Sequence, residues 1–353
     1  MKRTIFMKTL VAAAPGKAVY TDEYSKPKAT GDHVVVKVLR NGICATDMAI
    51  LEGTAGFIKD GSTPYPVRFG HEFVGKVVEC GGEVKHLKPG DRVISEGFVS
   101  CGTCEACKKG QYERCRNMRS VGTVNTWPGS YAEYCLFPER HLIKIPESFS
   151  DDLAALIEPA AVGMLGVKKC AIKPGESTVL VIGVGPIGIA AAALAKHYGA
   201  KKVMISGRTP WKLEIAKQLG VDAVCNPTEE SLKDFVMRET DGKGVDSIIE
   251  CSGNISVLDD ALDVLATFGK LVVVAFYEKR YDTFDLDKLT MKEGSILTVV
   301  YHDYEDVIRA MEEGLDLTPL ITRHIPFNEC GPYMERCLSE KKKDYIKLMV
   351  DFD

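Results

Sequence analysis

Short apolar runs alternate with turn residues over the first part of the chain, up to about residue 150. The runs are rich in β-branched residues, as in Val34–Leu39, Val74–Glu79 and Arg92–Ser95. Gly81-Gly82 and Pro89-Gly90-Asp91 between them are typical of tight turns. This spacing predicts an antiparallel, β-rich domain.

The pattern changes near Asp151, where an Ala- and Leu-rich helix is expected at Asp152–Val167. Strands and helices then alternate, which predicts a parallel sheet with right-handed crossovers. The expected strands are Thr178–Ile182, Lys202–Ser206, Ala223–Cys225, Val245–Glu250 and Lys270–Ala275, and the expected helices are Pro186–Tyr198, Trp211–Leu219, Ser231–Glu239 and Val257–Ala266.

The alternation ends after about Lys292. We expect a strand at Ile296–Val300, a helix at Tyr304–Glu313 and a final strand at Tyr345–Phe352. The apolar run Ile296–Val300 is placed where it could pair across a subunit edge.

Composition narrows the class of protein. The chain has 353 residues, 45% of them hydrophobic, which is enough for two domains with their own cores. A formal charge of -4 gives no reason to expect a nucleic acid or an anionic membrane as partner. Lys8 interrupts the apolar start, so we expect no signal peptide, and Leu180–Ala195, the nearest approach to a membrane span, contains a Gly-rich turn. A cytoplasmic location is therefore the expectation.

A glycine-rich motif follows the first strand of the alternating region. VIGVGPIG at Val181–Gly188 has the spacing Gly183-x-Gly185-x-x-Gly188 and opens an Ala-rich helix. This context is typical of a dinucleotide-binding loop, in which a tight turn brings phosphates to the helix N-terminus. The candidate cofactor contacts here are Gly183, Gly185, Pro186, Ile187 and Gly188.

The next strand ends without the carboxylate that usually binds the ribose of NAD. Its end is Ser206-Gly207-Arg208-Thr209. Arg208 would favour a 2′-phosphate, with Ser206, Thr209 and Lys212 assisting, so NADP is favoured over NAD. The alternative is that Arg208 is a solvated surface residue and NAD binds.

Two later strand ends are further candidates for contact with the nicotinamide, although packing at a strand end explains them nearly as well. They are Cys251-Ser252-Gly253 and Val274-Ala275-Phe276.

Four of the 12 cysteines lie in one short segment. Cys101, Cys104, Cys107 and Cys115 form C-x-x-C-x-x-C with a fourth Cys after a seven-residue gap. Four thiolates suit a tetrahedral zinc ion with no open position, which is a structural site. An iron–sulfur cluster is the rival, but the long gap and the absence of a following Cys-Pro argue against it.

Catalysis requires a further device, and three segments carry suitable ligand types. They are Gly42–Asp47, Gly70–Gly75 and Ile157-Glu158-Pro159. Each alone has an ordinary explanation, as a core cysteine, a satisfied histidine or a helix start.

Taken together, the motifs resemble the zinc-dependent medium-chain dehydrogenase family. CATD, GHEFVG, the turn at Pro89–Val93, the four-cysteine segment and VIGVGPIG occur in the family's order and span almost the whole chain. Glu158-Pro159 resembles the polyol and threonine dehydrogenase branch. The resemblance implies an α/β protein: a GroES-like, β-rich catalytic domain in residues 1–152, with a structural zinc lobe at about 98–118. It further implies a Rossmann domain, doubly wound around a parallel sheet, in 153–294 and a segment, 295–353, that returns to the first domain.

The resemblance also implies roles for individual residues. The implied ligands of a catalytic zinc are Cys44, His71, Glu72 and Glu158. Thr46 matches the hydroxyl that takes the substrate proton, and Asp47 matches a residue that steadies the site. Since two carboxylates and one thiolate would make the site net negative, we expect either Glu72 or Glu158 to be loosely bound.

Two departures from the family pattern concern the residues after Cys44. Ala45 replaces a common glycine. Met48–Leu51 lacks the His or Tyr that relatives often place there, so the usual proton exit or substrate contact is not carried over.

We therefore expect an enzyme with two zinc ions per chain, a structural one in the four-cysteine segment and a catalytic one in a groove between two domains. It would transfer a hydride between NAD(P) and a secondary alcohol of a polyol, sugar, cyclitol or sugar-acid-type substrate. Tyr301, His302 and Asp303 are candidate contacts to substrate hydroxyls. The resemblance implies a homotetramer or homodimer.

Three alternatives remain at this stage. The substrate could be L-threonine or a simple alcohol. A zinc-free reductase on the same scaffold would lack both metal clusters. A zinc-ribbon binding module joined to a nucleotide sensor would not need Cys44, Thr46, His71 or Glu158.

Overall fold

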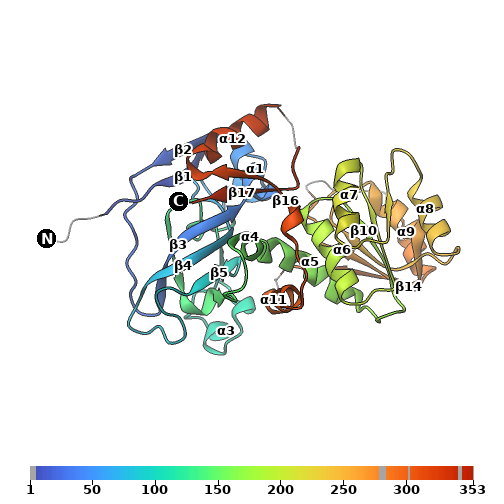
Figure 1. The fold of residues 1–353 in the computed structure, drawn as a ribbon, viewed down its shortest axis with the longest axis horizontal. Helices are drawn as coiled ribbons and strands as arrows, with labels where there is room; N and C mark the ends of the chain where they lie inside the picture. Colours follow the sequence, from blue (N-terminus) through green and yellow to red (C-terminus); the bar gives the residue numbers. More distant parts are fainter. Residues whose placement is uncertain (1–4, 278–283, 301–302, 341–343, 353) are drawn as a thin grey trace. The chain divides into compact units, whose positions relative to one another are not determined.

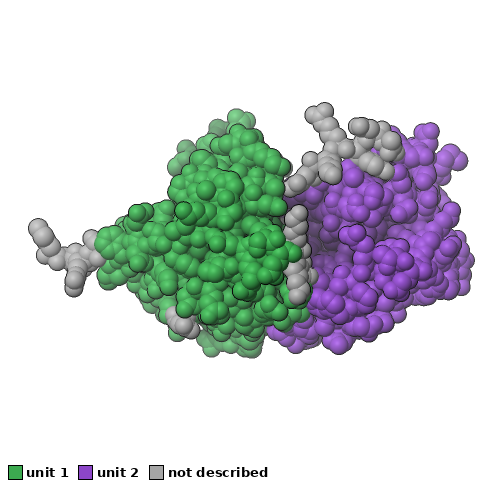
Figure 2. All heavy atoms as spheres, turned by 90° about the horizontal axis from the view of Figure 1, so that it is seen from above, with its two compact units in different colours: residues 1–158, 321–353 green, residues 159–320 purple. Residues whose placement is uncertain are grey.

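The computed structural model describes residues 5–277, 284–300, 303–340 and 344–352. It divides into two compact units, coloured separately in Figure 2. Unit 1 comprises Met1–Glu158 and Ile321–Asp353, and unit 2 comprises Pro159–Leu320. None of the helices in the described ranges combines the length and hydrophobicity that crossing a bilayer requires.

Unit 1 is built on a seven-stranded sheet with the order β16-β17-β3-β4-β5-β9, in which β8 also pairs with β3 (Figure 1). All pairs are antiparallel except β16–β17. The strands are β3 (His33–Gly42), β4 (Glu72–Cys80), β5 (Arg92–Ser95), β8 (Tyr134–Pro138), β9 (Leu142–Lys144), β16 (Ile321–Pro326) and β17 (Lys347–Asp351). Two smaller pairs are β1 (Thr9–Ala14) with β2 (Lys17–Thr21) and β6 (Phe98–Val99) with β7 (Arg119–Ser120).

The core of unit 1 follows from the period-two pattern of its strands. Val34, Val36 and Val38 on β3 are fully buried and pack with Phe73 of β4 and Phe137 of β8. The helical segments of this unit are α1 (Ala45–Glu52), α2 (Gly56–Lys59), α3 (Glu105–Lys108), η1 (Tyr112–Arg114), η2 (Glu139–His141), α4 (Asp151–Ala155), the start of α5 (Ile157–Cys170) and α12 (Phe327–Glu340).

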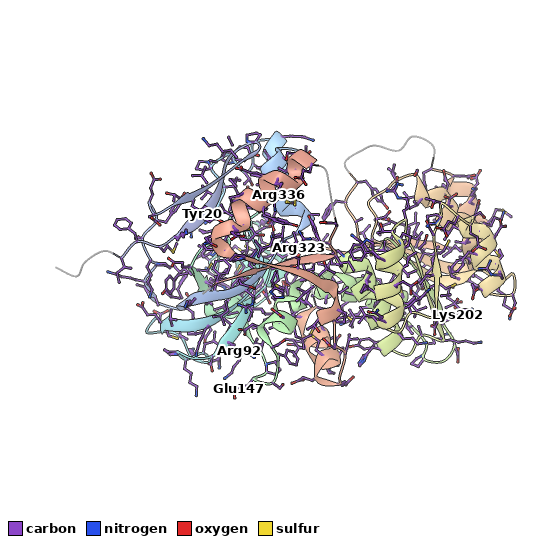
Figure 3. The ribbon with its side chains drawn as sticks, turned by 45° about the horizontal axis from the view of Figure 1, so that its top comes forward. Tyr20, Arg92, Glu147, Lys202, Arg323 and Arg336 are labelled. Atoms are coloured by element: carbon purple, nitrogen blue, oxygen red, sulfur yellow. The ribbon has the colours of Figure 1, made fainter. Side chains whose placement is uncertain are left out.

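The C-terminal segment is tied to unit 1 by polar contacts as well as by β16 and β17. The hydroxyl of Tyr20 donates to the carbonyl of Phe327, at the start of α12. Arg323 Nη1 donates to the hydroxyl of Tyr333 at 2.8 Å. Tyr20 and Arg323 are labelled in Figure 3, on β2 and β16.

Unit 2 is a six-stranded parallel sheet with the order β12-β11-β10-β13-β14-β15. The order reverses between β10 and β13, as in a doubly wound dinucleotide-binding fold. The strands are β10 (Thr178–Ile182), β11 (Lys202–Ser206), β12 (Ala223–Cys225), β13 (Val245–Glu250), β14 (Leu265–Val273) and β15 (Ser295–Thr298). The helices are the rest of α5, α6 (Pro186–His197), α7 (Pro210–Gln218), α8 (Leu232–Glu239), α9 (Val257–Val264), α10 (Leu286–Thr290) and α11 (Tyr304–Glu312), followed by η3 (Thr318–Leu320).

The predicted fold class, a GroES-like β-rich domain with a Rossmann parallel-sheet domain, is confirmed. The domain boundaries differ from those expected at 152/153 and 294/295, since the units meet at 158/159 and 320/321. Residues 295–320 stay with unit 2 because β15 pairs with β14, and the return to unit 1 begins only at β16.

Two element boundaries also differ from the expectation. The helix expected at Asp152–Val167 is two helices, α4 and α5. The helix expected at Val257–Ala266 ends at Val264, because Leu265 already pairs with Val245 of β13 and starts β14.

Candidate active site

Three side chains that carry metal-ligand atoms converge where β3 ends and β4 begins. Cys44 is the N-cap residue of α1, directly after β3, while His71 and Glu72 stand at the start of β4. Antiparallel pairing places Gly42 opposite Glu72 and so brings the two strand ends together. One ligand atom from each of the three lies within 4.8 Å of the others, a spacing that a single bound metal ion requires.

A buried carboxylate orients the histidine of this cluster. Asp47 is fully buried, and its Oδ2 accepts hydrogen bonds from the backbone N–H of Cys44 at 2.9 Å and the hydroxyl of Tyr131 at 3.0 Å. Its Oδ1 lies 3.6 Å from His71 Nδ1, and neither atom has a hydrogen-bond partner. The carboxylate thus faces Nδ1 and leaves Nε2 for a metal, so the donor set fits a zinc ion.

The electrostatics of the cluster match this arrangement. Burial opposes the charged form of His71, but the Asp47 carboxylate and the Cys44 thiol outweigh it and raise the His71 pKa well above the usual value. Burial raises the pKa of Asp47, although the charge of His71 acts in the opposite direction. The protonation of His71 and that of Asp47 therefore depend on each other.

A buried lysine pairs with Glu72, and the sequence analysis did not single it out. Lys347 Nζ lies 2.7 and 2.6 Å from the two carboxylate oxygens of Glu72, and it donates to the carbonyl of Ile43 at 3.2 Å. Both side chains are only 2% exposed. The available signal was a lysine inside the apolar run Tyr345–Phe352, which is unexpected in a buried strand unless the charge is paired.

Glu158 and Thr46 are the other two site residues that the resemblance implied, and each has its own environment. Glu158, near the start of α5, is 6% exposed, and burial raises its pKa to about 7 although His71 acts in the opposite direction. Its carboxylate is not part of the group of ligand atoms that lie within 4.8 Å of one another. Thr46 is half-buried in the first turn of α1. The structure therefore brings together Cys44, His71 and Glu72 but leaves Glu158 outside that group.

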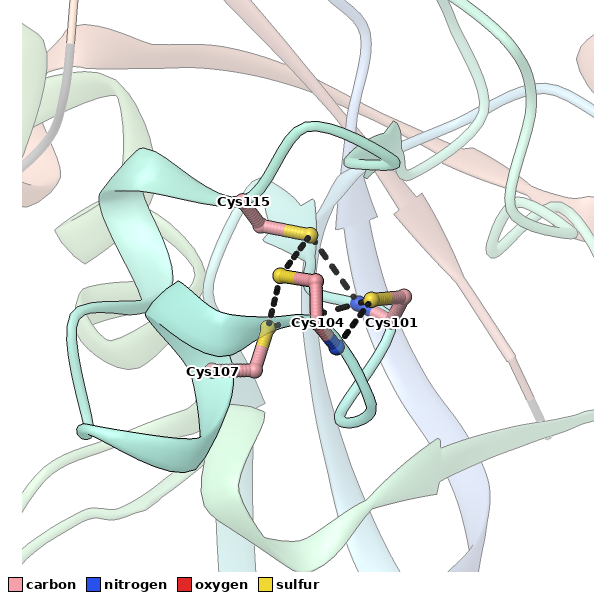
Figure 4. A group of neighbouring side chains, drawn as sticks. All are labelled: Cys101, Cys104, Cys107 and Cys115. Carbon is pink, nitrogen blue, oxygen red and sulfur yellow. Dashed lines mark hydrogen bonds between the residues drawn. The ribbon is translucent and has the colours of Figure 1, made fainter.

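The four cysteines of residues 101–115 face one another on a compact loop (Figure 4). The Sγ–Sγ distances are 3.4 Å for Cys104–Cys107 and 3.9 Å for both Cys101–Cys107 and Cys104–Cys115. A tetrahedral zinc with about 2.3 Å bonds separates its sulfurs by about 3.8 Å, whereas a disulfide would need about 2 Å. All four thiols are free, and hydrogen bonds from Thr103 lower the pKa of Cys101 to about 5, which favours the thiolate.

The glycine-rich loop has the geometry that phosphate binding demands. Gly183 follows β10 with φ +114°, and a Cβ there would lie 2.9 Å from the nitrogen of Ser252. A Cβ on Gly188 would overlap the carbonyl of Gly183. Gly185 is the N-cap of α6, with Pro186 as the first helical residue and nothing within 4 Å of the position of a Cβ. The helix N-terminus is therefore open to a pyrophosphate.

The residues after β11 lie at the carboxyl edge of the sheet, where the adenosine ribose binds in this fold. A Cβ on Gly207 would overlap the Val184 side chain, so this position favours glycine. Arg208 is exposed, Thr209 is the N-cap of α7, and Lys212 Nζ lies 5.3 Å from the ring centre of Trp211.

The candidate residues for the nicotinamide side follow β13 and β14. Cys251 is half-buried and Ser252 exposed, while Val274 is buried and Phe276 is 84% exposed. Ala275, half-buried, donates its N–H to the carbonyl of Glu250 at 3.2 Å.

The candidate substrate contacts after β15 are only partly described. Tyr301 and His302 lie outside the described residues. Asp303 has another role from the one expected, because it caps α11 by accepting the N–H of Asp306 at 3.2 Å and forms an ion pair with Lys168.

Two family models match most of the chain. The alcohol dehydrogenase GroES-like domain matches residues 30–147, and the zinc-binding dehydrogenase model matches residues 186–316. The L-threonine 3-dehydrogenase of Alteromonas mediterranea is 34% identical over 90% of this chain and 92% of its own length.

Solved structures of similar proteins have the same fold as this chain. A Sinorhizobium meliloti 1021 protein, assigned as a zinc-binding dehydrogenase and bound to NADP, superposes with a TM-score of 0.87 at 27% identity, covering 98% of this chain and 99% of its own. The 2R,3R-butanediol dehydrogenase of Bacillus subtilis superposes with a TM-score of 0.86 at 27% identity, covering 98% and 100%.

Fold and site together define a zinc-binding dehydrogenase with a GroES-like domain. The chain belongs to the zinc-dependent medium-chain dehydrogenase family. It is therefore an oxidoreductase of the class that uses zinc and a nicotinamide dinucleotide.

Proposed function

We propose that the protein transfers a hydride between NAD(P), with NADP preferred, and a secondary alcohol of a polyhydroxylated small molecule. The observation that carries this proposal is the convergence of Cys44, His71 and Glu72 beside two buried charged residues. A thiol, an imidazole and a carboxylate with ligand atoms within 4.8 Å of one another form a donor set that suits a zinc ion.

We assign each residue a role in that reaction. Cys44 and His71 would hold the catalytic zinc, which would supply Lewis acidity toward the substrate oxygen. Asp47, with its Oδ1 3.6 Å from His71 Nδ1, faces that nitrogen and so keeps Nε2 directed at the metal. Thr46, in the first turn of α1, takes the substrate proton at its hydroxyl and passes its own hydroxyl proton outward to water.

The two glutamates have different roles in this proposal. Lys347 engages both oxygens of Glu72, which restrains this carboxylate from binding the metal permanently. Glu158 completes the site directly or through a water molecule. This division of roles agrees with the expectation that one of the two glutamates is loosely bound.

L-Threonine is the second candidate substrate, because the L-threonine 3-dehydrogenase of Alteromonas mediterranea is 34% identical. We rank polyhydroxylated alcohols first because Glu158 favours a secondary alcohol on such a substrate.

A cofactor-linked absorbance screen tests the proposal. Polyols, sugars, cyclitols, sugar acids and L-threonine are offered with NAD and NADP in parallel. Reduction of the cofactor by a polyol, sugar, cyclitol or sugar acid supports the proposal, and turnover of L-threonine alone favours the second candidate. Absence of turnover with every member of the panel, by protein with a full metal content, contradicts both.

Replacing Arg208 with Asp is expected to reverse the cofactor preference. A lost charged contact to the 2′-phosphate costs about 1.5–3 kcal/mol, equivalent to about a 10- to 100-fold rise in KM for NADP. The introduced carboxylate favours the free ribose hydroxyls of NAD. Steady-state kinetics with both cofactors measure the change, and an unaltered ratio of kcat/KM values would refute the role of Arg208. Lys201→Asp, at an exposed position before β11, is the matched control.

We also propose that the chain forms a homodimer or homotetramer in the cytoplasm. The edge strand β15 supports self-association, since it ends the sheet of unit 2 and carries Ile296, which is 39% exposed. Nearby in the sequence, Met291 and Val300 are 83% and 53% exposed. Apolar side chains on an unpaired edge are typical of strands that pair with a second copy.

A further inference from the structure

A buried carboxylate stands at the point where the strand order of unit 2 reverses. Glu250 is the last residue of β13 and pairs in register with Ile182, the last residue of β10. It has no exposed surface. The glycine-rich loop begins at the next residue of the neighbouring strand, so Glu250 lies beside the crevice in which this fold binds dinucleotides.

The Glu250 carboxylate ties two loops to this position. Its Oε1 accepts hydrogen bonds from the backbone N–H of Ser252 at 2.7 Å and from the Ser252 hydroxyl. Its Oε2 accepts a hydrogen bond from the hydroxyl of Tyr277 at 2.5 Å. The backbone carbonyl of Glu250 accepts the N–H of Val274 at 2.9 Å. Loop 251–254 and segment 274–277 are thus anchored on a single residue.

One of these loops packs directly on the glycine-rich turn. A Cβ on Gly183 would lie 2.9 Å from the nitrogen and 3.1 Å from the Cα of Ser252. Any shift of Ser252 therefore changes the surface on which the glycine-rich turn packs. The hydroxyl of Tyr277 stays protonated and able to donate, because burial and the Glu250 hydrogen bond both raise the Tyr277 pKa.

The position of Glu250 in the sheet determines which half of a bound dinucleotide this residue can affect. In this fold the adenosine ribose binds at the end of the second strand, here β11, on one side of the reversal point. The nicotinamide half then lies on the other side, over the ends of β13 and β14. Glu250, Ser252 and Tyr277 all lie on that second side.

We propose that Glu250 is a positioning residue for the nicotinamide half of the cofactor. Its carboxylate holds loop 251–254 against the glycine-rich loop and ties segment 274–277 to the same point, so that this half of the site is shaped before the cofactor arrives. Preorganisation of this kind increases affinity by removing the cost of ordering loops on binding. The inference rests on the proposed use of NAD(P) and concerns Glu250 and Tyr277, to which the sequence analysis gave no role.

The test compares a whole dinucleotide with its adenosine fragment by isothermal titration calorimetry. The probes are the reduced dinucleotide that the wild type binds more tightly, and the matching fragment, 2′,5′-ADP for NADPH or ADP for NADH. Glu250→Gln keeps the size of the side chain but removes its charge. We expect this variant to bind the dinucleotide about 10- to 100-fold more weakly and the fragment with unchanged affinity.

Three further variants, one of them a control, complete the test. Tyr277→Phe removes a single hydroxyl and keeps Glu250, so it tests the same network if Glu250→Gln does not fold; we expect about a 3- to 10-fold loss for the dinucleotide alone. Arg208→Asp is the reciprocal variant, and it should weaken the 2′,5′-ADP fragment and NADPH alike. Glu239→Gln, at the end of α8 where Glu239 pairs with Lys202, is the control for removing a carboxylate elsewhere in the unit.

The outcomes separate this inference from the proposed function. Equal weakening of dinucleotide and fragment in Glu250→Gln, or unchanged binding of both in Glu250→Gln and Tyr277→Phe, would overturn the role of Glu250 while leaving the proposed function intact. Wild-type protein that binds neither dinucleotide would overturn the proposed function and this inference with it.

Discussion

Replacing Lys347 with methionine is expected to lower the free energy of unfolding by about 3–5 kcal/mol, because it leaves the Glu72 carboxylate buried without its cation. Both partners are almost fully buried, so solvent cannot compensate for the loss. The freed carboxylate also becomes available as a permanent metal ligand. We expect kcat/KM to fall about 10- to 100-fold, as is typical when a residue supporting a ligand is removed. Urea unfolding, followed by steady-state kinetics, measures both effects.

The double variant Glu72→Gln with Lys347→Met is the control for this expectation. If the penalty arises from an unpaired buried charge, removing the second charge should restore most of the lost stability. A single Lys347→Met variant as stable as the wild type would show that Glu72 finds another cation or takes up a proton at no cost, and the assigned role would fail.

Two cysteine substitutions are expected to distinguish the role of the catalytic metal site from that of the structural one. Wild-type protein should contain about two zinc ions per chain, and Cys44→Ala and Cys104→Ala should each contain about one. Cys44→Ala should lose at least about a thousandfold in kcat, because a metal supplies several kcal/mol of stabilisation to the transition state and each tenfold in rate corresponds to about 1.4 kcal/mol. Cys104→Ala should instead lower the melting temperature, because a closed four-thiolate site contributes to folding.

Elemental analysis and thermal unfolding give these quantities. Cys80→Ala is the matched control, since Cys80 lies at the end of β4 outside both clusters and should leave the zinc content at about two. A wild-type content of about one zinc, unaffected by Cys44→Ala, would favour the reading of the chain as a zinc-ribbon module with a nucleotide-binding unit.

Local pattern predicts the parallel sheet of unit 2 well. The expected bounds of β10, β11, β12 and β13 agree with the structure, because each strand is a short apolar run closed by glycine or polar residues. The start of β14 is not predicted in the same way. Phe268 there has a φ of +61° and is 69% exposed, an irregularity of the strand that no simple periodicity encodes.

Helix α12 shows a second limit of local pattern. We predicted no element between Tyr304–Glu313 and the final strand. This stretch contains Gly331-Pro332, a pair that normally interrupts a helix. The structure continues the helix through Pro332, and the N–H of Gly331 donates to the hydroxyl of Tyr20 at 3.1 Å. A tertiary contact with β2 thus supplies what the local sequence lacks.

The residues of the candidate site also differ in whether the local sequence could predict them. Cys44, His71 and Glu72 could be found because they stand in short motifs that begin or end strands. Lys347 could not be paired with Glu72 from spacing, since 275 residues separate them. Glu158 was expected as a ligand on the same grounds as Cys44 and His71, and the structure leaves it outside the close group.

The late position of Lys347 has a consequence for biosynthesis. Every residue of unit 2 leaves the ribosome before β16 and β17 are made, so the unit interrupting the chain can fold while the one that begins it is still incomplete. The counter-charge for Glu72 is therefore made after the whole of unit 2, on β17. A chain that stops before β17 would contain the complete parallel-sheet unit but not the lysine that neutralises Glu72.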